Sequence, residues 1–193
     1  MPPKAKFSKE EITKAALTIV REEGVDSLTS RALGAKLGSS ARPIFTVFQN
    51  MEEVQQSVIE EAKKRYKEYV QKGLSQKPAF KGVGMQYILF AINEPKLFRL
   101  LFMNEHKQIP DLTDVLPLID DNYEQIISSI QRDFGIDSVS AVKLYRHLWI
   151  YTHGIAMLCA TNMCRFTGEE ISKMMTEVCV SLLKNMGVRK HDD

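Results

Sequence analysis

The sequence is poor in the features that mark secreted, zinc-binding or membrane-spanning proteins. Its three cysteines are an odd number, lie between residues 159 and 179, and contain no CxxC spacing. Neither a disulfide framework nor a zinc ribbon is therefore expected. The first eleven residues are polar, whereas a signal peptide needs an apolar segment there. The longest apolar run, about residues 144–160, contains Arg146 and two histidines and is too short to cross a bilayer. We expect a cytoplasmic protein without a membrane partner.

Motifs for catalysis and for cofactor or metal binding are also missing. The sequence contains no GxGxxG, P-loop, HExxH or GxSxG segment. Among its four histidines, His147 and His153 are six residues apart and would point to different sides of one helix. We expect neither an enzyme nor a bound cofactor or metal ion.

Helix-forming residues are abundant, and helix breakers are few. The 193 residues include only 10 Gly and 7 Pro, and the rich content of Ala, Leu, Ile, Met, Glu and Lys favours helix over strand. Ser8 with Glu11 and Thr167 with Glu170 have the spacing of capping boxes. The apolar periodicity predicts an all-α fold of about nine helices, over residues 9–23, 29–37, 41–48, 51–72, 79–92, 95–104, 112–133, 138–163 and 168–186.

A basic N-terminal segment precedes a nearly neutral remainder. Residues 1–50 hold eight Lys/Arg and five Asp/Glu, whereas residues 51–193 hold 18 and 19. In the basic segment, two short predicted helices are joined by Gly38-Ser39-Ser40 behind an amphipathic helix, which is the pattern of a helix-turn-helix. We predict a DNA-binding domain over residues 1–50 and a second helical domain over 51–193, whose first helix, 51–72, connects the two.

The third predicted helix has one apolar face and one face of small or basic residues. Ile44, Val47 and Phe48 would anchor it to the first two helices. Small side chains permit close approach to the major groove, and an arginine can pair with a guanine edge. The residues on this second face are Ser40, Ala41, Arg42 and Thr46.

The spacing of residues across this segment resembles the N-terminal signature of the TetR family of bacterial repressors. The matching residues are Ile12, Ala15, Ala16, Gly24, Leu28, Thr29, Leu33, Leu37, Gly38, Ile44, Phe45, Phe48, Glu52, Glu53 and Val54. The resemblance implies a homodimer with a three-helix DNA-binding domain and a divergent ligand domain. It also implies that Thr29 is a phosphate-contacting helix cap and that Arg31 can reach bases.

Two positions depart from the family pattern. Members of the family usually have Tyr at the position of Phe45 and Lys at that of Met51, and both usual residues contact phosphates. Phe45 lacks the hydroxyl, and Met51 lacks the charge. We expect phosphate contacts to depend more on Thr29, on the Asn50 cap and on Lys4, Lys6 and Lys9.

The second domain contains candidate ligand-binding residues on two predicted helices. The helix near 95–104 carries Phe98 and Phe102, and the helix near 138–163 is apolar on most sides, which predicts burial all round. Tyr145, Trp149 and His153 recur every four residues and share one face. Trp149 and His153-Gly154 resemble a Trp…His-Gly class of C-terminal domain in the same family. These five aromatic side chains predict an apolar cavity for an unidentified effector, although ordinary core packing explains them equally well.

The last predicted helix has a long apolar stripe, which would be a liability if exposed on a monomer. We expect it to pair with its symmetry mate in a homodimer. The expected interface residues are Ile171, Met174, Met175, Val178 and Leu182.

The sequence therefore favours a transcriptional repressor that an apolar or aromatic small molecule releases from a palindromic operator. Two alternatives remain open. One is a repressor that senses oxidants through Cys164, which adjoins Arg165. The other is a helical protein that binds only other proteins. The sequence identifies neither the effector nor the operator, and an activator role stays open.

Overall fold

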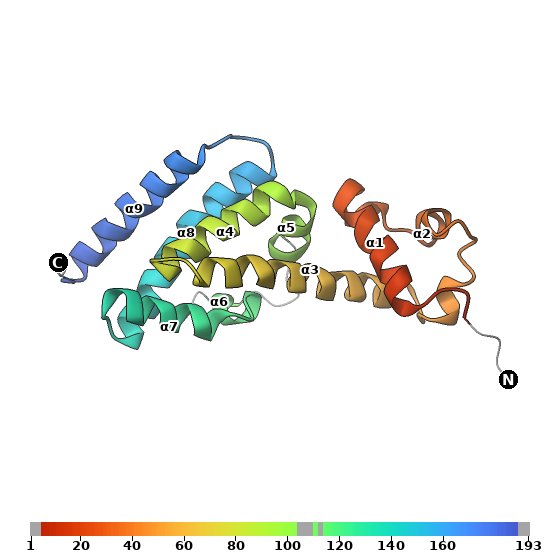
Figure 1. The fold of residues 1–193 in the computed structure, drawn as a ribbon, viewed down its shortest axis with the longest axis horizontal. Coiled ribbons are helices and arrows are strands. Elements are labelled where there is room, and N and C mark those ends of the chain that lie inside the picture. Colours follow the sequence, from red (N-terminus) through yellow and green to blue (C-terminus); the bar gives the residue numbers. More distant parts are fainter. Residues whose placement is uncertain (1–4, 104–109, 112–113, 189–193) are drawn as a thin grey trace. The chain divides into compact units, whose positions relative to one another are not determined.

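The computed structural model describes residues 5–103, 110–111 and 114–188 and is drawn in Figure 1. These residues form an all-helical fold, as the sequence predicted. The elements are α1 (Lys9–Glu23), η1 (Val25–Ser27), α2 (Ser30–Lys36), η2 (Ile44–Thr46), α3 (Met51–Leu74), α4 (Ala79–Asn93), α5 (Pro95–Phe102), α6 (Val115–Ile119), α7 (Tyr123–Phe134), α8 (Ser138–Ala160) and α9 (Gly168–Asn185), where η marks a 3₁₀ helix. None of the described helices is long and apolar enough to span a membrane.

The chain divides into two compact units, and α3 contributes to both. Unit 1 comprises residues 1–65 and 94–104, and unit 2 comprises residues 66–93 and 105–193. Unit 1 therefore contains α5 as well as the N-terminal helices. The functional boundary expected at residue 50 is not a boundary between compact units, and it stays a prediction.

Unit 1 has a small core that links α1 to its neighbours. α1 packs against α2 and α5. The side chains of Ile12, Ala16 and Val20 are fully buried on the inward face of α1. The capping box of Ser8 and Glu11 forms as predicted and fixes where α1 begins.

Unit 2 is organised around α4. This helix packs against α7, α8 and α9, and its side chains Ile88, Phe90 and Ala91 are fully buried. The second capping box, Thr167 with Glu170, begins α9 as predicted. Because apolar residues surround α4 on several sides, it acts as the central helix of unit 2.

One predicted helix is split in two. The expected helix over 112–133 is interrupted between α6 and α7, and residues 112–113 lie outside the described part of the chain. Asp120 has an extended backbone at φ −131° and ψ 103°. Its carboxylate accepts a hydrogen bond from the backbone N–H of Asn122 at 2.9 Å. This local bond offers the backbone an alternative to the helix, so the helix ends there.

Candidate functional site

In unit 1, α2, a tight turn and the 3₁₀ turn η2 occupy the place of the predicted helix-turn-helix, and the tight turn depends on two glycines. Gly34, in α2, is buried, and a Cβ added there would lie 2.9 Å from the backbone N of Ala41. Gly38 has φ +62°, a left-handed conformation that favours glycine. The N–H of Ser39 then returns to the carbonyl of Gly34 at 2.9 Å. Close approach at Gly34 and the reversal at Gly38 therefore fold the Ser39–Ala41 segment onto α2.

The third element is shorter than the predicted helix over 41–48. Only Ile44–Thr46 is helical, as a single 3₁₀ turn, so the predicted α-helix is wrong in type and length. In an α-helix, the carbonyl of Pro43 would accept from the N–H of Val47. Instead, the Thr46 hydroxyl donates to that carbonyl at 2.7 Å, and the N–H of Val47 bonds to Ile44 at 3.1 Å.

This turn still separates a buried side from an exposed one. Ile44 and Phe48 are buried as predicted. The exposed side carries Arg42, Thr46 and Phe45, and Phe45 is 45% exposed. The buried side agrees with the anchoring role expected of Ile44 and Phe48, and groove contact by the exposed residues stays a prediction. Ser40 is also exposed, and Ala41 is half-buried.

α2 supplies the other predicted contacts. Thr29 is its N-cap, and its side chain accepts from the N–H of Ala32 at 3.1 Å, which confirms the predicted cap. Arg31 is exposed in the first turn of α2. Neither Arg31 nor Arg42 forms an ion pair or hydrogen bond with any residue that the structure describes.

Three other cations of unit 1 have partners. Lys36 bonds to Glu22 at 3.0 Å, and Lys9 lies 3.5 Å from Glu53. Lys9 also lies over the ring of Phe48, at 5.1 Å from the centroid. Lys6 donates to the Ser39 hydroxyl at 3.1 Å. Lys6 and Lys9 therefore both contact residues of the helix-turn-helix segment itself.

Asn50 caps α3 in the predicted manner. Its side-chain oxygen accepts from the N–H of Glu53 at 2.8 Å. Glu53 in turn accepts from the N–H of Gln49 at 2.7 Å. That backbone bond, aided by Lys9, lowers the pKa of Glu53. Met51 begins α3, and Lys4 lies outside the described residues.

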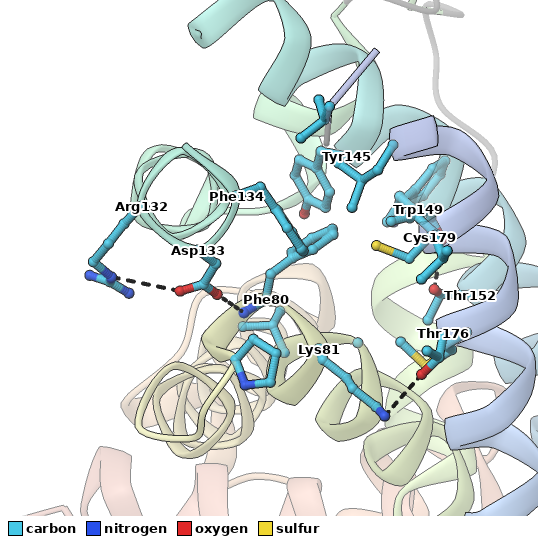
Figure 2. A pocket seen from close by; sticks show the side chains of 18 of the residues that line it. Phe80, Lys81, Arg132, Asp133, Phe134, Tyr145, Trp149, Thr152, Thr176 and Cys179 are labelled. Carbon is cyan, nitrogen blue, oxygen red and sulfur yellow. Dashed lines mark hydrogen bonds and ion pairs between the residues drawn. The ribbon is translucent and has the colours of Figure 1, made fainter. Parts of the chain in front are cut away.

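Unit 2 contains a cavity of about 1310 Å³. Two of the predicted ligand-binding residues, Tyr145 and Trp149, line it. Figure 2 shows these side chains with Phe80, Phe134 and Cys179 around the same space. The cavity lies between the first half of α4, the end of α7, α8 and α9. Its volume is ample for a small organic ligand.

His153 lies behind the cavity wall instead of in it. Its Nδ1 is 2.8 Å from the Tyr87 hydroxyl, and its ring stacks on Trp149 with centroids 5.0 Å apart. Tyr87 and Trp149 line the cavity, but His153 does not. Burial lowers the pKa of His153, which favours the neutral ring, and this ring contacts two wall residues.

Phe98 and Phe102 do not line this cavity, which corrects the expectation that they share a pocket with Trp149. Both belong to α5 in unit 1, where their ring centroids are 5.3 Å apart and Phe98 is fully buried. The apolar side of α5 is occupied by packing in unit 1, including α1. An apolar stripe in the sequence does not distinguish such a core from a ligand pocket.

A buried carboxylate supports the tyrosines of the cavity. Asp120 accepts a hydrogen bond from the Tyr66 hydroxyl at 2.9 Å and from that of Tyr145 at 3.5 Å. Burial raises the pKa of Asp120, and bonds from Asn122 oppose the rise.

Sequence reasoning missed Tyr66, Tyr87, Phe80 and Lys81, although the apolar faces of 79–92 were a visible signal.

The sequence predicted that α8 is buried on all sides, and this prediction is wrong. Ile150 is 49% exposed and Met157 is 37% exposed. They are seven residues apart and share one face of the helix. In α9, Ile171 and Met175 are buried within the chain, and Met175 lies against Gly84. These two residues therefore need no second copy to cover them, whereas Met174, Val178 and Leu182 are half-buried.

Comparison with known proteins gives one structural neighbour of note. No family model matches the sequence, and no curated protein matches it either. The fold is similar to that of a transcriptional regulator from Rhodococcus sp. Rha1, with a TM-score of 0.57 and 12% sequence identity. The similarity covers 93% of this chain and 97% of that one, so it extends over both units. Among the described residues, no group of three or more His, Cys, Asp or Glu side chains is placed to hold a metal ion.

Proposed function

We propose that this protein is a transcriptional regulator that binds double-stranded DNA through α2, the following turn and η2. The observation that carries the proposal is the state of Arg31 and Arg42, which are exposed and unpaired among the described residues. Lys9 and Lys36 of the same unit are neutralised by glutamates. Two uncompensated arginines on a helix-turn-helix suit a partner that offers phosphates and base edges.

Several independent features support the same proposal. The segment from Ile12 to Val54 resembles the TetR signature, and the neighbouring structure is that of a transcriptional regulator. We infer a homodimer whose two η2 turns enter successive major grooves, roughly 34 Å apart on a palindrome. The exposed apolar face of α8 with Ile150 and Met157, and the half-buried side chains of α9, support a self-association surface.

The cavity of unit 2 is the proposed effector site. Its aromatic walls, Tyr145 and Trp149 among them, suit an apolar or aromatic body. We infer repression by occupancy, in which effector binding changes α3, the helix that contributes to both units, and lowers operator affinity. The coupling is reciprocal, so operator DNA weakens effector binding by the same factor.

The test begins with selection of duplexes from a random pool by the full-length protein. Arg31→Ala and Arg42→Ala should each weaken binding to a selected duplex, by about 1–3 kcal/mol if the arginine contacts a guanine. Arg165→Ala, which removes an exposed charge in unit 2, is the matched control and should bind normally. Failure to enrich any sequence, with equal weak binding by all four proteins, would contradict the proposal.

A further inference from the structure

The cavity of unit 2 combines aromatic walls with an excess of cations. Its charged lining residues are Lys81, Arg132, Lys184 and one carboxylate, Asp133. Figure 2 shows Lys81 beside the space that Phe80, Phe134 and Trp149 surround. Because an apolar cavity is costly for any unpaired charge, the partners of these four groups indicate what chemistry the cavity accepts.

The single carboxylate is already engaged. Asp133 accepts a hydrogen bond from the backbone N–H of Phe80 at 3.0 Å, which caps the first turn of α4. Its other oxygen lies 3.8 Å from the Nε of the neighbouring Arg132. The negative charge of Asp133 therefore interacts with the N-terminal end of α4 and with Arg132. It does not compensate the charge of Lys81.

Lys81 is held by a neutral group. Its ammonium donates to the Thr176 hydroxyl at 3.0 Å, across from α4 to α9. No carboxylate of the described residues lies within ion-pair distance of Lys81 or Lys184. Lys81 is half-buried as a residue, but its bond to Thr176 is exposed, so the ammonium stays open to a ligand and has no counter-charge among the described residues.

A nearby buried acid does not change this balance. Asp120 is 5% exposed and is not a lining residue of the cavity. Its carboxylate accepts from the hydroxyls of Tyr66 and Tyr145 and from both nitrogens of Asn122. The tyrosine hydroxyls therefore face the acid, and what remains for a ligand is ring surface. A cationic ligand would find no free carboxylate in the lining.

We propose that the effector of this cavity is an amphipathic organic anion. Its carboxylate or sulfonate pairs with Lys81, and its aromatic or aliphatic body lies against Phe80, Tyr145 and Trp149. The inference rests on the proposed function in one respect, that this cavity is the effector site. It narrows the ligand from any apolar molecule to one with an acidic group, because only such a group compensates Lys81.

A pair of fluorescent probes with the same aromatic body tests the proposal. 1-Anilinonaphthalene-8-sulfonate carries an anionic group, and N-phenyl-1-naphthylamine lacks it. The wild-type chain should bind the sulfonate more tightly, and binding should quench Trp149, the only tryptophan of the chain. Lys81→Met should weaken sulfonate binding by about tenfold or more and leave the neutral probe unaffected. Lys81→Arg should keep the preference.

Controls separate this effect from loss of folding or of overall charge. Lys173→Met removes an exposed charge of α9 that does not line the cavity and should change neither affinity. Thermal melts should agree among all variants. Equal affinity of the wild-type chain for both probes, or an unchanged sulfonate affinity in Lys81→Met, would overturn the anion proposal alone. Absence of Trp149 quenching by both probes would contradict the cavity as an effector site and would leave DNA binding to its own test.

Discussion

Arg21 donates two hydrogen bonds to Glu94, from Nε to Oε2 and from Nη2 to Oε1, each 2.8 Å long. Arg65 donates to the same Oε1 at 2.7 Å. Glu94 is 5% exposed and precedes α5, so one carboxylate joins α1, α3 and α5 within unit 1. Such a paired geometry fixes orientation as well as contributing free energy.

We predict that Glu94→Gln lowers the free energy of unfolding by about 1–3 kcal/mol, since bonds to charged groups are each of about that size. The measurement is urea denaturation followed by circular dichroism. Glu23→Gln, an exposed position at the end of α1, is the control and should stay near the wild-type value. Equal stability of the two variants would show that the Glu94 cluster contributes nothing net.

The exposed ring of Phe45 leads to a prediction about affinity for DNA. Phe45→Tyr adds a hydroxyl where the resembling family contacts a phosphate, and it should tighten binding by about 0.5–1.5 kcal/mol on selected and random duplexes alike. Met51→Lys should also tighten binding. It should make the slope of log affinity against log salt concentration more negative by about one. Titrations at several salt concentrations measure both effects. A gain confined to one sequence would indicate base contact instead.

The cysteines should differ in reactivity. Burial raises the pKa of Cys179 to about 11, so at pH 8 only about one thiol in a thousand is the reactive thiolate. Cys164 is exposed. Iodoacetamide at pH 8 should modify Cys164 first and Cys179 last, as mass spectrometry of the peptides will record. Raising the pH towards 11 should narrow the difference in modification rate between Cys164 and Cys179.

The same cysteines test the redox alternative. If oxidation regulates DNA binding through Cys164, peroxide should release DNA from the wild-type chain and leave the Cys164→Ser variant bound. Retention of DNA by the wild-type chain after peroxide would exclude that alternative and favour the effector cavity.

Self-association is predicted to depend on the half-buried side of α9. Leu182→Glu should raise the dissociation constant of the dimer by about tenfold or more, because the charge would lose hydration in the interface. Sedimentation velocity measures the change, and Ser128→Glu on the exposed side of α7 is the control. Met175→Glu is not equivalent, since Met175 is buried against Gly84 and its replacement should lower the melting temperature of the chain itself.

Local signals predicted the helices well, because capping and periodicity depend on neighbouring residues. Ser8 with Glu11 and Thr167 with Glu170 form the expected capping boxes. The exposed positions of Arg31 and Arg42 also agree with the face assigned to them. Single side-chain bonds were harder to foresee. The Thr46 hydroxyl on Pro43 shortens one helix, and the Asp120 carboxylate on Asn122 interrupts another.

The cavity was only partly predictable, because it depends on which helices meet. Tyr145 and Trp149 share a face of α8, and their spacing placed them correctly in the lining. Phe98 and Phe102 have equally suggestive spacing, but α5 belongs to unit 1. Lys81 and Thr176 are 95 residues apart in sequence, and no local pattern pairs them.

The crowding at Gly34 has a consequence for the proposed recognition of DNA. Packing of the turn is assigned to Gly34, Ile44 and Phe48, which are buried, whereas Arg42 and Thr46 are exposed. Under the proposed function, folding and base recognition therefore reside in different residues. Sequence preference would then evolve by substitution at the exposed positions with little loss of stability, as long as residue 34 remains glycine.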